Sequence, residues 1–221
     1  MIKNPDKKYI GKIDEYKVCL VNGSEIRKSV SLDDYRKGCR LPDFLDFGVY
    51  SSENNYSGFR EIPKNEIWIA EEIDKNEKRA AIKCAIVYLR LQKKQYNENV
   101  AYVKAKMFEK KIREKYNTFT ETDILIKNIG TINGITVTLV NGFAVRNLKD
   151  DDFSQGGHDL VYNYIPENTI WIDNTIASDE YGAVMVHEYV ERHLMKNKKY
   201  EYEKAHELAT RAEYKYRENK K

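Results

Sequence analysis

Histidine and glutamate side chains near the carboxyl end of the sequence have the types and the spacing of a metal site. His187 and Glu191 are four residues apart, so on a helix they lie on the same face. His206 lies in a second predicted helix, and a short connection makes the two helices antiparallel neighbours. Two imidazoles and one carboxylate, with an open coordination position, are a typical ligand set of catalytic zinc. We therefore predict that His187, Glu191 and His206 bind Zn²⁺ or another divalent metal.

Two further residues near this set could take part in the chemistry. Glu188 directly follows the first predicted ligand, and in helix-borne zinc motifs that position holds the general base that activates water. His158 follows Gly156-Gly157 in a predicted loop, where paired glycines let the backbone approach closely. His158 is a candidate fourth ligand, or a group that stabilises a transition-state oxyanion. We predict catalytic roles for Glu188 and His158.

The remaining polar residues of this region have alternative interpretations. Glu213 lies two helical turns beyond His206; it either orients a histidine through its ring N–H, replaces Glu191 as a direct ligand, or pairs with a nearby basic side chain. Arg192 either supports the site, where it could anchor a substrate carboxylate, or is a solvated arginine. His193 points to another side of its helix, and we expect it at the surface. A simpler interpretation of the pair in the first helix is a surface ion pair.

The first helix carries a resemblance to a known family. His187-Glu188-Tyr-Val-Glu191 resembles the His-Glu-x-x-His helix of the zincin metallopeptidases, with glutamate at the second ligand position. The strand predicted at 170–173 lies where zincins have an edge strand at the rim of the active site. The resemblance covers roughly residues 165–213. It implies a zinc-dependent peptidase or a related hydrolase with Glu188 as the general base.

The same half of the chain is also similar to a group of small, mostly uncharacterised phage and bacterial proteins. This likeness implies the site but no particular reaction. The shared pattern is Gly156-Gly-His158, Ile165-Pro…Ile170-Trp-Ile-Asp173, His187-Glu188…Glu191-Arg192 and Tyr202…Ala205-His206…Ala209…Glu213.

The elements that position these residues occur twice in the sequence. Residues 11–23 match 130–142, residues 62–69 match 165–172, and residues 102–106 match 202–206, in the same order. Two copies are too few for a solenoid and indicate a tandem of related units. We place a first unit at residues 1–118 and a second unit, with the predicted metal site, at residues 119–221.

Each copy predicts the same succession of elements. It opens with alternating apolar and polar residues punctuated by Asn-Gly pairs, which suit tight hairpin turns. A short strand follows, and two helical stretches close the copy. In the second copy these helices begin near Ser178 and near Glu201. We predict an α+β fold with a tandem internal duplication, in which each unit is a small antiparallel sheet followed by a helical hairpin.

The predicted site residues are absent from the first copy. All four histidines of the chain lie in the second copy, whereas apolar positions recur in both. A polar set that is lost together was used together, which supports the grouping. Matching the copies places Cys84 opposite His187, Ala85 opposite Glu188, Tyr88 opposite Glu191, Lys106 opposite His206, Arg113 opposite Glu213 and a loop near Asn55 opposite His158.

The helices of the first copy have a basic character of their own. Residues 83–115 contain ten lysines or arginines against three glutamates, with tyrosines interleaved. Such a pair of helices could contact nucleic-acid phosphates, or it could be a solvated face. If the pair binds nucleic acid, reversing the charges of Lys106, Lys110 and Arg113 should weaken a salt-dependent retention of DNA or RNA.

Composition limits the classes of function. The chain has 221 residues, is 41% hydrophobic and 33% charged, and has a net charge of +3, so it can bury a core. It has no apolar run long enough for a membrane helix and no apolar N-terminal stretch. Cys19, Cys39 and Cys84 are not clustered, and we expect reduced thiols in a cytoplasmic protein.

Together these features predict a cytoplasmic zinc-dependent hydrolase, with an amide or peptide bond as the expected substrate. The alternative is a non-catalytic binding or accessory module of phage origin, in which the metal is purely structural or absent. Nucleic-acid binding through the first copy is a further alternative, and no feature of the sequence addresses the oligomeric state.

Overall fold

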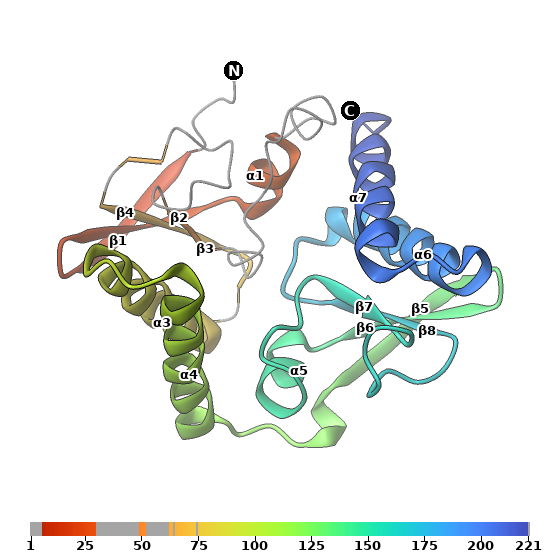
Figure 1. Ribbon diagram of the computed structural model, residues 1–221, viewed down its shortest axis with the longest axis horizontal. Coiled ribbons are helices and arrows are strands. Elements are labelled where there is room, and N and C mark those ends of the chain that lie inside the picture. The colour runs from red at the N-terminus through yellow and green to blue at the C-terminus, as the bar shows by residue number, and fades with distance from the viewer. Residues whose placement is uncertain (1–5, 30–48, 52–61, 64, 74, 221) are drawn as a thin grey trace. The chain divides into compact units, whose positions relative to one another are not determined.

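The computed structural model describes residues 6–29, 49–51, 62–63, 65–73 and 75–220 (Figure 1). The chain divides into two compact units, and residues 120–220 belong to the second. The first unit contains β1 (Lys7–Ile13), β2 (Tyr16–Val21), α1 (Gly23–Ser29), β3 (Val49–Ser51), β4 (Glu66–Ala70), α3 (Lys75–Lys93) and α4 (Glu98–Tyr116). The second contains η2 (Glu121–Asp123), β5 (Leu125–Ile132), β6 (Ile135–Val140), α5 (Gly142–Leu148), β7 (Gly156–His158), β8 (Thr169–Asp173), η3 (Ser178–Glu180), α6 (Tyr181–Lys198) and α7 (Tyr202–Glu218).

Each unit is a four-stranded sheet with a helical hairpin, so the predicted α+β class is confirmed. The strand orders, β1-β2-β4-β3 and β5-β6-β8-β7, are equivalent. The predicted antiparallel sheets are wrong, because the central pairs β2–β4 and β6–β8 are parallel. A parallel pair needs a crossover connection, and the segments containing α1 and α5 supply it.

The Asn-Gly pairs have two different structural roles. Asn133 and Gly134 both have positive φ angles, 49° and 79°, and they form the predicted tight turn between β5 and β6. Asn22 and Asn141 instead start helices. The side-chain oxygen of Asn141 accepts a hydrogen bond from the Ala144 N–H at 3.2 Å, and that of Asn22 accepts one from the Glu25 N–H at 3.0 Å. The turns predicted at these two positions are therefore wrong.

The core of the second unit lies between its sheet and α6, which Figure 1 shows against the strands. Alternate residues of β6 and β8 point to this face because side chains of a strand alternate between faces. Trp171 and its counterpart Trp68 are buried, as expected of packing residues. The apolar cluster between the sheet and α6, to which α6 contributes Val184, consists of Ile135, Val137, Leu139, Ile170, Ile172, Ile176 and Val184.

Strand β8 is an interior strand. It pairs with β6 on one side and with β7 on the other, so the edge strand expected at residues 170–173 is wrong. The short strand β7 takes that edge position, and it delivers His158 to the site described below. In the described part of the chain, no helix has the length and apolar character needed to cross a bilayer. Cys19 and Cys84 are buried free thiols, and Cys39 lies outside the described residues.

Candidate metal centre

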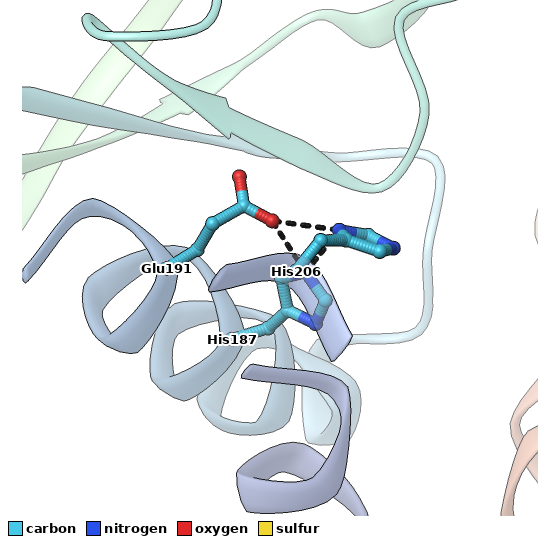
Figure 2. A group of neighbouring side chains, drawn as sticks. All are labelled: His187, Glu191 and His206. Carbon is cyan, nitrogen blue, oxygen red and sulfur yellow. Dashed lines mark hydrogen bonds and ion pairs between the residues drawn. The ribbon is translucent and has the colours of Figure 1, made fainter. Parts of the chain in front are cut away.

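Helices α6 and α7 pack against each other and bring the three predicted ligands together (Figure 2). The connection between them is short because Lys199 adopts a left-handed conformation that ends α6. His187 and Glu191 project from one face of α6, and His206 faces them from the first half of α7. Glu191 Oε2 lies 2.6 Å from His206 Nδ1 and 3.4 Å from His187 Nε2, and these two nitrogens are 3.1 Å apart. This group could hold a metal ion.

A hydrogen bond at Nδ1 of His187 determines which ring nitrogen could bind a metal. Nδ1 lies 2.7 Å from Glu213 Oε2, and a carboxylate accepts the ring N–H. A proton therefore belongs on Nδ1, and Nε2, which faces Glu191 and His206, is the nitrogen that could bind a cation once its own proton is displaced. Burial favours neutral His187, but hydrogen bonds to Glu191 and Glu213 raise its pKa well above the usual range. Of the roles considered for Glu213, the structure supports two, because Oε2 contacts the His187 ring and Oε1 lies 2.7 Å from Arg217 Nη1.

His158 contacts the other oxygen of Glu191. Its Nε2 lies 3.0 Å from Glu191 Oε1, and its Nδ1 accepts the Leu160 N–H at 3.2 Å. A neutral imidazole whose Nδ1 accepts a hydrogen bond carries its proton on Nε2. His158 therefore donates to Glu191 and orients the carboxylate, which argues against the role of fourth ligand. His158, Glu188 and Glu191 also satisfy the distance criteria of a metal-binding group, but this tautomer leaves His158 without a lone pair for an ion there.

Glu191 is an ionised carboxylate between three histidines. Burial alone would raise its pKa, but hydrogen bonds with His158, His187 and His206 hold the pKa of Glu191 far below its usual range. One oxygen faces the two predicted histidine ligands and the other is bound by His158. The side chain is thus held with Oε2 directed toward the point where a cation would sit.

Glu188 is buried beside the ligands and has a different environment. Burial raises its pKa to about 8; Glu191 adds to the rise and His187 opposes it. Within the described residues no group hydrogen-bonds to this carboxyl group. Gly156 of β7 makes room for it, because a Cβ atom there would lie 3.2 Å from Glu188 Cγ. Glu188 is thus a carboxyl group that can exchange a proton near neutral pH.

Arg192 is neither solvated nor available to a substrate. It is 3% exposed and binds Asp159 with two nitrogens, at 2.5 and 2.9 Å. It also donates to the side-chain oxygen of Asn168 at 2.9 Å. The predictions of a solvated arginine and of a substrate anchor are wrong. Arg192 instead holds the loop that follows His158, so its support of the site is indirect.

One side of the group is open to solvent. The His206 side chain is 43% exposed, whereas those of Glu191 and His187 are largely buried. Tyr202 stacks on the His206 ring with centroids 5.4 Å apart, and Leu160 and Val161 are exposed just beyond His158. The half-buried His193 contacts Asn197 and Tyr189 and takes no part in the group.

A buried arginine that sequence reasoning missed lies behind Glu213. Arg217 Nη1 is 2.7 Å from Glu213 Oε1, and its Nη2 is 2.7 Å from Glu180 Oε2. Although burial would raise it, Arg217 and His187 hold the pKa of Glu213 at about 2. We call Glu180, Arg217 and Glu213 the second-unit clamp.

The first unit contains an equivalent arginine between two glutamates, without the proposed metal ligands; here Nε and Nη2 bind the glutamate of the last helix instead of the other one. Arg113 Nη1 is 3.1 Å from Glu77 Oε1 and Arg113 Nη2 is 2.5 Å from Glu109 Oε1. The Cys84 thiol interacts with Glu109, as His187 does with Glu213, and burial raises the pKa of this thiol. We call Glu77, Arg113 and Glu109 the first-unit clamp.

The clamps correct the match between α4 and α7, the last helices of the two units. Both α4 and α7 carry Ala-x-x-x-Ala-x-x-x-Glu-x-x-x-Arg, beginning at Ala101 and Ala205. These alanines are fully buried in both units, so His206 corresponds to Tyr102 rather than Lys106, and Glu213 corresponds to Glu109 rather than Arg113. The shared Glu-x-x-x-Arg pattern was the sequence signal for the missed arginine. The strand registers likewise place Ser51, not Asn55, opposite His158, because Ser51 pairs with Ile67 as His158 pairs with Ile170.

The basic helices of the first unit present fewer free cations than their sequence indicates. Lys106 and Arg113 are buried, and both pair with Glu109. Of the three residues chosen for a nucleic-acid test, only Lys110 is exposed. Two of these three positions are therefore structural.

Comparisons of the chain with protein-family models, curated proteins and solved structures found no match.

Proposed function

We propose that the second unit is a zinc-dependent hydrolase, with His187, Glu191 and His206 as the metal ligands. The observation that carries this proposal is the convergence of two imidazole nitrogens and one carboxylate oxygen, with Glu213 fixing the ligating nitrogen of His187. The donor set suits zinc, since two nitrogens and an oxygen are common zinc donors. Zinc bound there would act as a Lewis acid that polarises a carbonyl and lowers the pKa of water.

Glu188 supplies the proton transfer in this proposal. Its carboxyl group is buried beside Glu191 and has no hydrogen-bond partner among the described residues. A cation bound nearby favours the ionised form, and the carboxylate can then accept a proton from water. The same group can return that proton to the leaving amine. His158 positions Glu191 and does not itself exchange a proton with the substrate.

The proposed substrate is an amide or peptide bond flanked by an apolar group. The open side of the site is next to His206, whose side chain is 43% exposed. Among the described residues, Leu160, Val161 and Tyr202 are exposed large apolar side chains next to His158 or His206. Apolar surface near a site favours an apolar group on its ligand. A catalytic zinc site keeps one position for substrate, which fits three protein ligands better than a closed structural site.

Elemental analysis with three proteins tests the proposal. We expect about one zinc per wild-type chain, a loss of zinc in His187→Ala, and retained zinc in Glu188→Gln. Hydrolysis of amide substrates should fall by at least about a hundredfold in Glu188→Gln, because general acid–base catalysis contributes that much or more.

The same measurements separate the alternatives. If Glu188→Gln keeps its zinc and its function is unchanged, the result would favour a non-catalytic accessory module with a structural metal. A wild-type chain that takes up no zinc, even after reconstitution, would overturn the metal site.

A further inference from the structure

The two clamps offer a comparison within one chain. Both contain a buried arginine between two largely buried glutamates, and both place the second glutamate against the residue at the same position of the preceding helix. That residue is His187 in the second unit and Cys84 in the first. The clamp itself therefore does not depend on a histidine.

The second-unit clamp leaves little freedom to Glu213. Its Oε1 is held by Arg217 Nη1 at 2.7 Å, and its Oε2 faces His187 Nδ1 at 2.7 Å. Arg217 in turn is fixed by Glu180, which accepts from Nε at 2.9 Å and from Nη2 at 2.7 Å. The guanidinium group is planar and rigid, so two carboxylates bound to its different edges are fixed relative to each other.

We propose that Arg217 and Glu180 are positioning residues of the metal site. This inference rests on the proposed function. Arg217 and Glu180 hold Glu213 where it accepts the His187 Nδ1–H, and this hydrogen bond leaves Nε2 as the ligating nitrogen. Neither residue touches the three ligand atoms. Their effect reaches the metal through the orientation and tautomer of a single histidine.

The test compares paired variants in the full chain. Arg217→Lys keeps the charge but cannot bind two carboxylates with a planar fork, and Glu180→Gln keeps the shape but loses the charge. Arg113→Lys and Glu77→Gln make the same changes in the first unit, which holds none of the three proposed ligands. The readouts are the zinc dissociation constant, measured against a competing chromophoric chelator, and the unfolding temperature of each metal-free protein.

We expect Arg217→Lys and Glu180→Gln to raise the zinc dissociation constant by roughly tenfold to a hundredfold. Arg113→Lys and Glu77→Gln should leave the zinc dissociation constant within about twofold of wild type. They should nevertheless lower the unfolding temperature about as much as the two second-unit variants do. Equal zinc affinities in wild type and all four variants would overturn the positioning role and leave the metal site standing. Equal losses in all four would also overturn it, because they would reflect general destabilisation. A wild-type chain without zinc affinity would overturn the proposed function and this inference together.

Discussion

At the scale of single residues, the surroundings of two adjacent side chains on α6 divide their roles. His187 is bound on its Nδ1 side by Glu213, which directs its Nε2 toward Glu191 and His206. Glu188, the next residue, has no hydrogen-bond partner among the described residues and lies in a buried environment. His187 is therefore fixed in orientation, whereas Glu188 can exchange a proton. Metal-assisted hydrolysis, the proposed function, needs both kinds of residue.

The stability of the metal-free protein should report the burial of Glu188. Burial raises the pKa of this residue from 4.5 to about 8, so the unfolded chain loses its proton at lower pH than the folded protein does. The folded state therefore loses stability as the pH rises from about 4.5 to about 8. Glu188→Gln removes this loss, and we expect it to raise the free energy of unfolding by on the order of 2 kcal/mol near pH 8, with little effect near pH 4.

Urea denaturation with a chelator present, repeated across this pH range, measures the effect. Glu203→Gln is a suitable control because Glu203 is exposed on α7. A gain from Glu188→Gln that is the same at low and high pH would contradict the explanation by burial of the charge.

At the scale of elements, the contact between β7 and α6 sets the position of Glu188. A Cβ atom on Gly156 would lie 2.8 Å from Val184 Cγ1 and 3.0 Å from the Trp171 carbonyl oxygen. In the first sheet this register position holds Val49, and α3 has Ala81 and Ala85 where α6 has Val184 and Glu188. The second unit thus has the smaller residue on its strand and the larger residues on its helix, whereas the first unit has the reverse.

Gly156→Ala should separate β7 from α6. We expect the substitution to lower the free energy of unfolding by about 1–3 kcal/mol, because an added methyl group in a filled contact displaces its neighbours. Val184→Ala in the same chain removes the nearest obstructing atom and should recover part of the loss. Denaturation midpoints of the single and double variants measure this. A Gly156→Ala protein as stable as wild type would show that the contact is looser than described.

The elements also show how far the sequence alone could lead. The sequence was sufficient to predict that His187, Glu191 and His206 meet. Residues four apart share one face of a helix, and a short connection makes the two helices antiparallel neighbours. Spacing was insufficient for the match between α4 and α7. A slip of four residues nearly preserves the face of a helix; the pattern that the two helices share and the burial of Ala101 and Ala105 together show the correct match.

Other features depended on contacts distant in sequence. The burial of Arg192 follows from its pairing with Asp159, more than thirty residues earlier, and no local pattern indicates that partner. The parallel pairing of β6 with β8 is likewise set by the crossover through α5 and not by alternation within either strand. Asn141 has the same neighbour as the turn-forming Asn133, and only the following helix decides that it caps.

At the scale of the whole molecule, the proposed metal ligands lie in the second of two units that share one topology. Zinc should therefore stabilise the two units unequally. We expect hydrogen exchange of α6 and α7 to slow when zinc is added, because an ion that binds only the folded state stabilises it by about 2.7 kcal/mol at a hundred times its dissociation constant. Exchange of α3 and α4 should stay unchanged.

Mass spectrometry of peptides from the two helical hairpins distinguishes these responses. The first unit acts as the internal control, since its described residues include no group suited to an ion at the position of His187, Glu191 and His206. Equal slowing in both units, or slowing confined to the first, would contradict a site on α6 and α7.

The first-unit clamp forms around Cys84 without a histidine, and the second-unit clamp has the same arginine and glutamate framework. The helical hairpin therefore has a charged brace of its own, unlike small zinc domains that unfold when the ion is removed. If the proposed zinc site is present, the protein should release and rebind the ion without unfolding. Loading of the proposed site would then be a reversible control of the proposed activity.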